Sequence, residues 1–200
     1  MPRRSQSINE YALGLAGDKQ PKKYYLVAIP DGELAVKAKA LQEEISELYK
    51  VYREPFPPLH LTVAVIAFPP AALANITEQL AGFAKDFLPL KLSTLGAGCF
   101  PDPYKSIHLS VERTDELVRL SSTVFALLTG IGYSADSFNS WDYHISLVNR
   151  NYAAREWTEA EFEEACLHLS REQLVLTGTA KRLELWDPAF PPLNVLASFP

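Results

Sequence analysis

The fold follows from two similar segments of the chain, His60-Leu61-Thr62-Val63-Ala64 and His144-Ile145-Ser146-Leu147-Val148. Each segment begins with a histidine, places a hydroxyl residue two positions later, and is rich in β-branched and other apolar residues. Such alternation favours a β-strand. Residues i and i+2 of a strand point to the same face, so each histidine shares a face with its hydroxyl partner. Each pair can therefore reach a single ligand.

Strand and helix signals alternate on both sides of these two segments. Tyr24–Ile29 and Ser106–Glu112 read as the strands that come before them, and apolar residues at helical spacing lie in between. The first strand begins 36 residues before His60, and its counterpart begins 38 residues before His144. This agreement indicates a repeat of organisation rather than of residues. The further predicted elements are helices at 73–87 and 158–169, strands at 90–95, 174–186 and 194–199, and a loop at 96–103.

The element order predicts an α+β fold in which a β-α-β-α-β unit occurs twice. We expect a bilobal domain over residues 23–200, with lobe-forming repeats at about 24–98 and 104–200, preceded by an N-terminal arm over 1–22. Each lobe would be a sheet with helices on its outer side. The two sheets would then face a central cleft, which is the natural place for a site.

Composition restricts the classes of partner. The 200 residues carry a net charge of −5, which argues against a coat for duplex DNA, since that needs a basic stripe. No run approaches 18 apolar residues, so we expect no membrane span. The apolar patch after Arg3-Arg4 is too short for an export signal, and Cys99 and Cys166 are most simply buried thiols. These features favour a cytoplasmic monomer.

All four histidines are followed two positions later by Ser or Thr, and their local structure separates them. His168 lies at the end of a helical stripe, where such a pair diverges. His108 lies on the first strand of the second unit, where it either lines the cleft or is an ordinary surface histidine. Only His60 and His144 occupy matching positions in the two units.

Two histidines that flank a phosphate can perform in-line displacement at phosphorus. Histidine titrates near neutrality, so one can accept a proton from the attacking oxygen while the other donates one to the leaving oxygen. The hydroxyls of Thr62 and Ser146 can hydrogen-bond the non-bridging oxygens, where charge accumulates. The histidines and cysteines show no metal-ligand spacing, and the chain has no phosphate-binding loop of the P-loop type. We therefore expect neither a metal nor another cofactor.

With its two H-x-[ST]-x motifs 84 residues apart, the chain resembles the two-histidine (2H) phosphoesterase superfamily, which includes the 2′-5′ RNA ligase-like proteins and cyclic phosphodiesterases. The resemblance covers Tyr24 to the C-terminus. It implies a 2′-5′ RNA ligase-like fold and hydrolysis of 2′,3′-cyclic phosphates, or related phosphodiesters, of RNA ends or small nucleotides. It also implies that His60 and His144 are catalytic and that Thr62 and Ser146 bind phosphate.

Three further residues are candidates for substrate binding. Arg150 comes just after the second motif, where some RNA ligase-like members have basic residues. If the strand continues, Arg150 points to the same face as His144 and could bind the phosphate. An ordinary surface arginine at the end of a strand fits the sequence equally well. Tyr104 shares the polar face of its strand and could stack on a base. His108 is the third candidate, as a neighbour of the cleft.

Two alternatives to hydrolysis remain open from the sequence. A binding module could hold an RNA end or a cyclic nucleotide without turning it over, and it would keep both motifs. Alternatively, 2′-5′ RNA end-joining passes through the same transition state as cleavage in the opposite direction. The sequence alone does not separate these possibilities.

Overall fold

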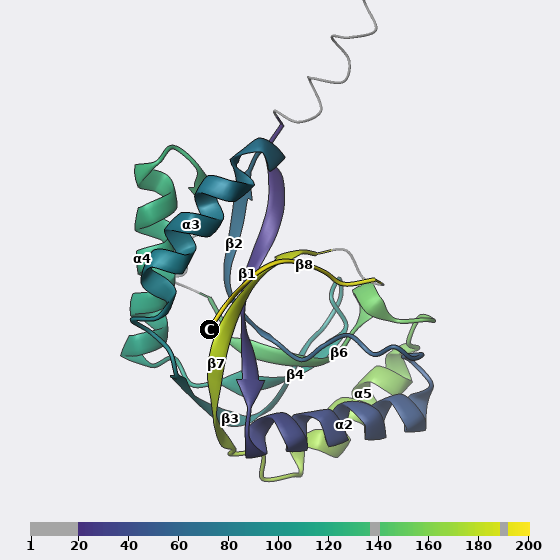
Figure 1. Ribbon diagram of the computed structural model, residues 1–200. Coiled ribbons are helices and arrows are strands. Elements are labelled where there is room, and N and C mark those ends of the chain that lie inside the picture. The colour runs from purple at the N-terminus through teal and green to yellow at the C-terminus, as the bar shows by residue number, and fades with distance from the viewer. Residues whose placement is uncertain (1–19, 137–140, 189–191) are drawn as a thin grey trace, which may run out of the picture.

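The structure is a computed structural model that describes residues 20–136, 141–188 and 192–200 (Figure 1). Most of the predicted N-terminal arm therefore lies outside the described residues. The strands are β1 (Lys22–Asp31), β2 (Leu61–Phe68), β3 (Leu90–Phe100), β4 (Ser106–Val111), β5 (Ser134–Ala135), β6 (His144–Asn149), β7 (Thr177–Asp187) and β8 (Asn194–Phe199). The helices are α2 (Glu33–Tyr49), α3 (Leu73–Ala84), α4 (Asp115–Gly130) and α5 (Glu159–Ser170), with short 3-10 turns η1 (Pro70–Ala72) and η2 (Arg150–Tyr152).

The strands form one antiparallel sheet of eight strands in the order β1-β2-β6-β4-β3-β7-β8, with β5 beside β2. The mixed α+β class is confirmed, but the two predicted sheets are continuous. β7 joins them because it is long: one of its edges pairs with β1, while the other pairs first with β3 and then with β8. β2 and β6 meet through the pair Leu61 and Ile145, which places the starts of the two motif strands side by side.

Near its start, each motif strand buries one face and leaves the other partly exposed. In β2, Leu61 and Val63 are fully buried, whereas Thr62 between them is half-buried. In β6, Ile145 and Leu147 are fully buried and Ser146 is half-buried. Burial of the alternate apolar side chains fixes the register, because a shift of one residue would bring the polar face into the core.

The helices pack as two pairs, and each pair takes one helix from each half of the chain. α3 packs against α4, and the hydrogen bond between Glu44 and His168 links α2 to α5. Figure 1 shows α3 and α4 together on one side of the strands, with α2 and α5 together below them. Among the described residues, no helix is both long and apolar enough to cross a membrane.

Capping residues explain where two of the helices begin. The Thr114 hydroxyl accepts a hydrogen bond from the Leu117 N–H at the start of α4. At α5, Thr158 and Glu161 form a capping box, in which each side chain accepts a hydrogen bond from the other residue's backbone N–H. The start of α5 agrees with the helix predicted at 158–169.

The predicted loop at 96–103 is wrong over its first half, because β3 continues to Phe100 and pairs with β4. Gly96 adopts φ 134° at a shift in register, a conformation that favours glycine. Gly98 lies opposite His108, and a Cβ built on Gly98 would lie 2.5 Å from His108 Nε2. The glycines that suggest a loop thus mark a bulge and a close approach within a strand.

Cys99 and Cys166 form a disulfide, which corrects the prediction of two thiols. The extension of β3 carries Cys99 beneath α5, where Cys166 lies 6.2 Å away between Cα atoms. Sixty-seven residues separate the two cysteines, so sequence spacing gave no sign that they meet. The bond ties α5 to the strand that leads to Phe100.

Candidate active site

One cavity of about 390 Å³ collects the four residues on which the sequence analysis depends. His60 and Thr62 reach it from β2 and the residue before it, and His144 and Ser146 reach it from β6. The antiparallel contact of the two strands at Leu61 explains this convergence, because it brings the starts of both strands together. The two predicted histidine–hydroxyl pairs therefore share one cavity.

The two histidines are held in the same way. Nδ1 of His60 lies 2.8 Å from the carbonyl oxygen of Pro58, and Nδ1 of His144 lies 2.7 Å from that of Asp142. A carbonyl oxygen can only accept, so Nδ1 carries the proton in each bond. This leaves Nε2 of each ring available to accept a proton from a ligand, or to donate one when the ring is protonated.

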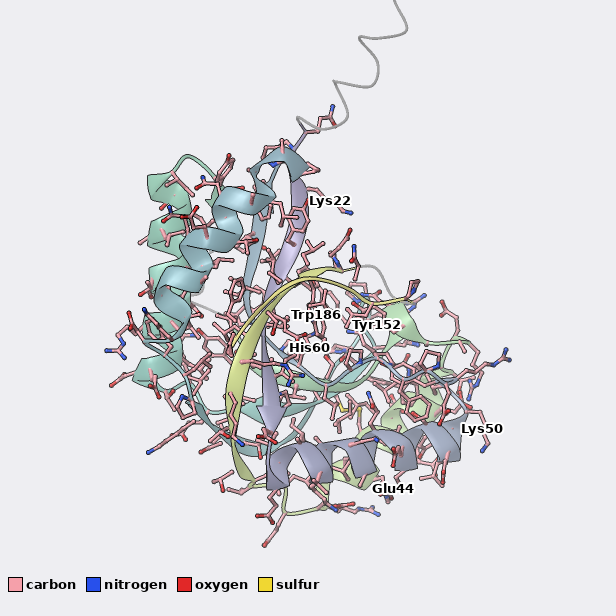
Figure 2. The ribbon with its side chains drawn as sticks, in the orientation of Figure 1. Lys22, Glu44, Lys50, His60, Tyr152 and Trp186 are labelled. Atoms are coloured by element: carbon pink, nitrogen blue, oxygen red, sulfur yellow. A yellow bond between two sulfur atoms is a disulfide. The ribbon has the colours of Figure 1, made fainter. Side chains whose placement is uncertain are left out.

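His60 packs against an aromatic ring. The Trp186 ring lies 4.6 Å from it between centroids, and Figure 2 shows these two side chains next to each other. Burial lowers the pKa of His60 to about 4, the hydrogen bond to Pro58 opposes this effect, and the charge of His144 adds to it. His60 is therefore neutral near pH 7 and suited to accept a proton.

His144 has a different environment. The Phe100 ring lies 5.0 Å away and the His108 ring 5.1 Å away between centroids. Burial lowers the pKa of His144, but both the hydrogen bond to the Asp142 carbonyl and the Asp142 carboxylate raise it. A carboxylate thus favours the protonated form of this histidine.

His108 lies behind His144 rather than in the cavity wall. Only 4% of it is exposed, and its ring stacks on Phe100 with centroids 4.1 Å apart. Its Nδ1 is buried and has no hydrogen-bond partner among the described residues. Burial, followed by the charge of His144, lowers its pKa to about 4. Of the two sequence-based interpretations, cleft lining or surface position, the structure shows neither.

The other two candidates differ in position. Tyr104 lines the cavity and is 56% exposed, so a ligand can reach its ring. Arg150 begins η2, and its guanidinium binds Asp102 at 2.9 Å and Glu156 at 2.8 Å instead of lining the cavity. His168 is exposed on the last turn of α5, as predicted, and Nε2 lies 3.0 Å from Glu44.

Sequence reasoning missed several tyrosines of the cavity wall. Tyr25, Tyr52 and Tyr152 line it from β1, the segment after α2, and η2. For Tyr25 a signal exists, because Tyr24 is buried and the next residue of a strand faces the other side. The Tyr52 hydroxyl accepts a hydrogen bond from the Asn149 N–H, a contact between distant segments that no local pattern predicts.

Potential metal ligands cluster elsewhere in the described part of the chain. Glu44, His168 and Glu172 offer ligand atoms within 4.8 Å of one another. They lie on α2 and at the end of α5, and none of them lines the cavity.

Comparison with known proteins places this site in a family. The family model for the 2′-5′ RNA ligase superfamily matches residues 30–189, a range that contains both motifs. The chain belongs to the 2′-5′ RNA ligase superfamily. The predicted membership among 2H phosphoesterases is confirmed, and membership supports a phosphoesterase-type activity in general. No curated protein matches the chain in sequence.

Solved structures of the superfamily fold resemble this chain at low sequence identity. A crystal structure of a phosphoesterase is 16% identical with a TM-score of 0.53, and covers 90% of this chain and 98% of its own. Escherichia coli LigT in its apo form is 14% identical with a TM-score of 0.54, covering 90% and 97%. LigT complexed with ATP is 14% identical with a TM-score of 0.52, covering 90% and 95%. These likenesses show the shared fold.

Proposed function

We propose that this chain is a metal-independent phosphodiesterase that hydrolyses the 2′,3′-cyclic phosphate of an RNA end or a small nucleotide. The observation that supports it is the pair of histidines in one cavity, each fixed through Nδ1 and each with a hydroxyl residue on the same strand face. One side chain of this type can accept a proton while the other donates one.

In the proposed reaction His60 is the base and His144 is the acid. Nε2 of His60 takes a proton from water as the water oxygen forms a bond to phosphorus. The bond from phosphorus to one ribose oxygen breaks, and protonated His144 gives its Nε2 proton to that oxygen. The assignment rests on Asp142, whose carboxylate raises the pKa of His144, whereas no carboxylate of a described residue opposes the lowered pKa of His60. Solvent then restores both protonation states.

Thr62 and Ser146 complete the proposed phosphate site. Both are half-buried cavity residues on the same strand faces as the two histidines. Their hydroxyls can donate hydrogen bonds to the non-bridging oxygens, which gain charge in the transition state. Donors already oriented by a strand need little reorganisation during the reaction.

The rest of the cavity suits a nucleoside. Its volume of about 390 Å³ lies within the usual range for small-molecule sites. Its wall contains the aromatic rings of Tyr25, Tyr104, Trp141 and Tyr152. Stacking of a base on such rings contributes about 1–3 kcal/mol. The complex of LigT with ATP supports a nucleotide ligand for this fold.

The direct test is product analysis with nucleoside 2′,3′-cyclic phosphates, in the presence and absence of a chelator. We expect a ring-opened monoester at the same rate in both reactions. Binding without any product over a long incubation would support the binding module instead. Formation of a 2′-5′ bond between RNA ends, without hydrolysis, would support end-joining.

A further inference from the structure

We propose that this site selects a substrate whose only negative charge is the phosphodiester that is cleaved. A nucleoside 2′,3′-cyclic phosphate with a free 5′-hydroxyl would then be preferred over the same compound with a 5′-phosphate. This inference rests on the proposed function and adds a substrate class to it.

Permanent positive charge is missing from the described part of the cavity wall. No Lys or Arg is among the described residues that line it, and Asp142 is the one carboxylate there. Burial disfavours the protonated forms of His60 and His144. The described wall thus offers one protonated histidine and several neutral hydrogen-bond donors. These groups can stabilise the single negative charge of a phosphodiester.

Three cations are adjacent in sequence to wall residues, and carboxylates hold two of them. The third, Arg53 beside Tyr52, is exposed and does not line the cavity. Arg150 lies between Asn149 and Asn151, two residues that line the cavity, but its guanidinium binds Asp102 and Glu156. Lys105, next to the wall residue Tyr104, binds Glu159 at 2.8 Å and also approaches Asp102. These carboxylates compensate the positive charges of Arg150 and Lys105, so neither is free to attract an anion to the wall.

Neutral groups form the rest of the wall, and they favour an uncharged nucleoside. The aromatic rings of Tyr104 and Trp141 can pack on a base, and the amides of Asn149 and Asn151 can bond to hydroxyls. A phosphate monoester adds nearly two negative charges at pH 7. Removing those charges from water without a cation is costly, and the Asp142 carboxylate repels them.

The test compares cytidine 2′,3′-cyclic phosphate with and without a 5′-phosphate. We expect kcat/KM to favour the 5′-hydroxyl compound by about 10-fold or more at low ionic strength, since one pair of close like charges costs on the order of that factor. Equal values, or a preference for the 5′-phosphate, would overturn the inference.

A new cation in the wall should weaken this selectivity. Asn151 is exposed, and its backbone N–H rather than its side chain bonds to Asn149, so Asn151→Lys should fold normally. We expect this variant to reduce the preference about threefold or more. Asn75→Lys on the exposed face of α3 is the matched control, with the same change in net charge and no expected effect. An equal effect of both variants would assign the selectivity to net charge and overturn the inference.

Calorimetric titration of both compounds into the His60→Ala variant separates this inference from the proposed reaction. If wild type hydrolyses neither compound but the variant binds the 5′-hydroxyl compound about 10-fold more tightly, the reaction fails and the charge selectivity stands. If wild type hydrolyses both equally well, the reaction stands and the inference fails. Equal affinities, or no binding of either compound at millimolar concentration, would also overturn the inference.

Discussion

The two motifs of this protein share a geometry but differ in their electrostatic surroundings. His60 and His144 donate Nδ1–H to the carbonyl oxygen two residues earlier, at 2.8 and 2.7 Å. His60 packs on Trp186, whereas His144 lies beside the Asp142 carboxylate and next to the stacked rings of Phe100 and His108. Two strands thus hold two like groups in the same way, and in the proposed reaction their different neighbours make His60 the base and His144 the acid.

Removing either imidazole should have the largest effect. We expect His60→Ala and His144→Ala each to lower kcat for a 2′,3′-cyclic nucleotide about 100-fold or more, because each loses one partner in acid–base catalysis. His168→Ala is the matched control, since His168 has the same tripeptide pattern but lies exposed on α5 beside Glu44. A large loss of kcat in only one of the two site variants would show that the two motifs do not contribute equally to catalysis.

The two hydroxyls should matter less than the histidines and about equally. Thr62→Val and Ser146→Ala each remove one donor from the proposed phosphate site, and we expect steady-state kinetics to show about a 10- to 100-fold loss of kcat. Ser170→Ala provides the control, since the Ser170 hydroxyl bonds to the Leu167 carbonyl at the end of α5. An unchanged kcat in both site variants would show that the two hydroxyls do not stabilise the transition state.

A side chain added beside His108 should disturb the position of His144 but not that of His60. In Gly98→Ala the new methyl would lie 2.5 Å from His108 Nε2, so the ring must move toward its neighbours Phe100 and His144. We expect a loss of about 1–3 kcal/mol in the free energy of unfolding, measured with denaturant, and a loss of activity.

Gly82→Ala is the control for that variant. Gly82 lies on α3, where an added Cβ meets nothing within 4 Å, so the substitution should leave stability unchanged or raise it by up to about 1 kcal/mol. If Gly98→Ala were as stable and as active as this control, His108 would not be packed as the structure shows.

The smallest effect should come from Asp142→Asn, and it should fall on one side of the pH profile. The carboxylate raises the pKa of His144, so its removal lowers that pKa. An acid must be protonated to act, and the alkaline limb of kcat/KM should therefore move to lower pH while the acid limb, set by His60, stays in place. Asp86→Asn, on an exposed turn after α3, is the control. If the acid limb shifted instead, His144 would be the base and His60 the acid.

The sequence predicted the parts of the site that depend on local pattern. Strand alternation and matched register located His60 and His144, and helical spacing located α3 and α5. Local pattern failed where tertiary contacts decide. The Gly-rich segment around Gly98 predicts a loop, yet Gly98 lies in β3 opposite His108, whose ring occupies the space that a side chain would need.

Long-range partners explain the other differences. The disulfide of Cys99 and Cys166 depends on the extension of β3 beneath α5, and the contact of Trp186 with His60 depends on β7 pairing with β1. Neither pairing leaves a mark on the sequence near the residues involved. The position of Arg150 also depends on distant residues. Strand alternation predicts that it faces the cleft with His144, but its guanidinium instead binds the carboxylates of Asp102 and Glu156.

The central claim is that both motifs meet one phosphate, and NMR of the histidine ring protons tests it most directly. Wild-type protein would be titrated with dimethyl phosphate, a phosphodiester that carries one negative charge and has no ring to open, while the Hε1 signals of all four histidines are followed. The account predicts that the signals of His60 and His144 shift together with one common Kd, while that of His168 does not move. A shift of only one of the two, or two clearly different Kd values, would contradict it.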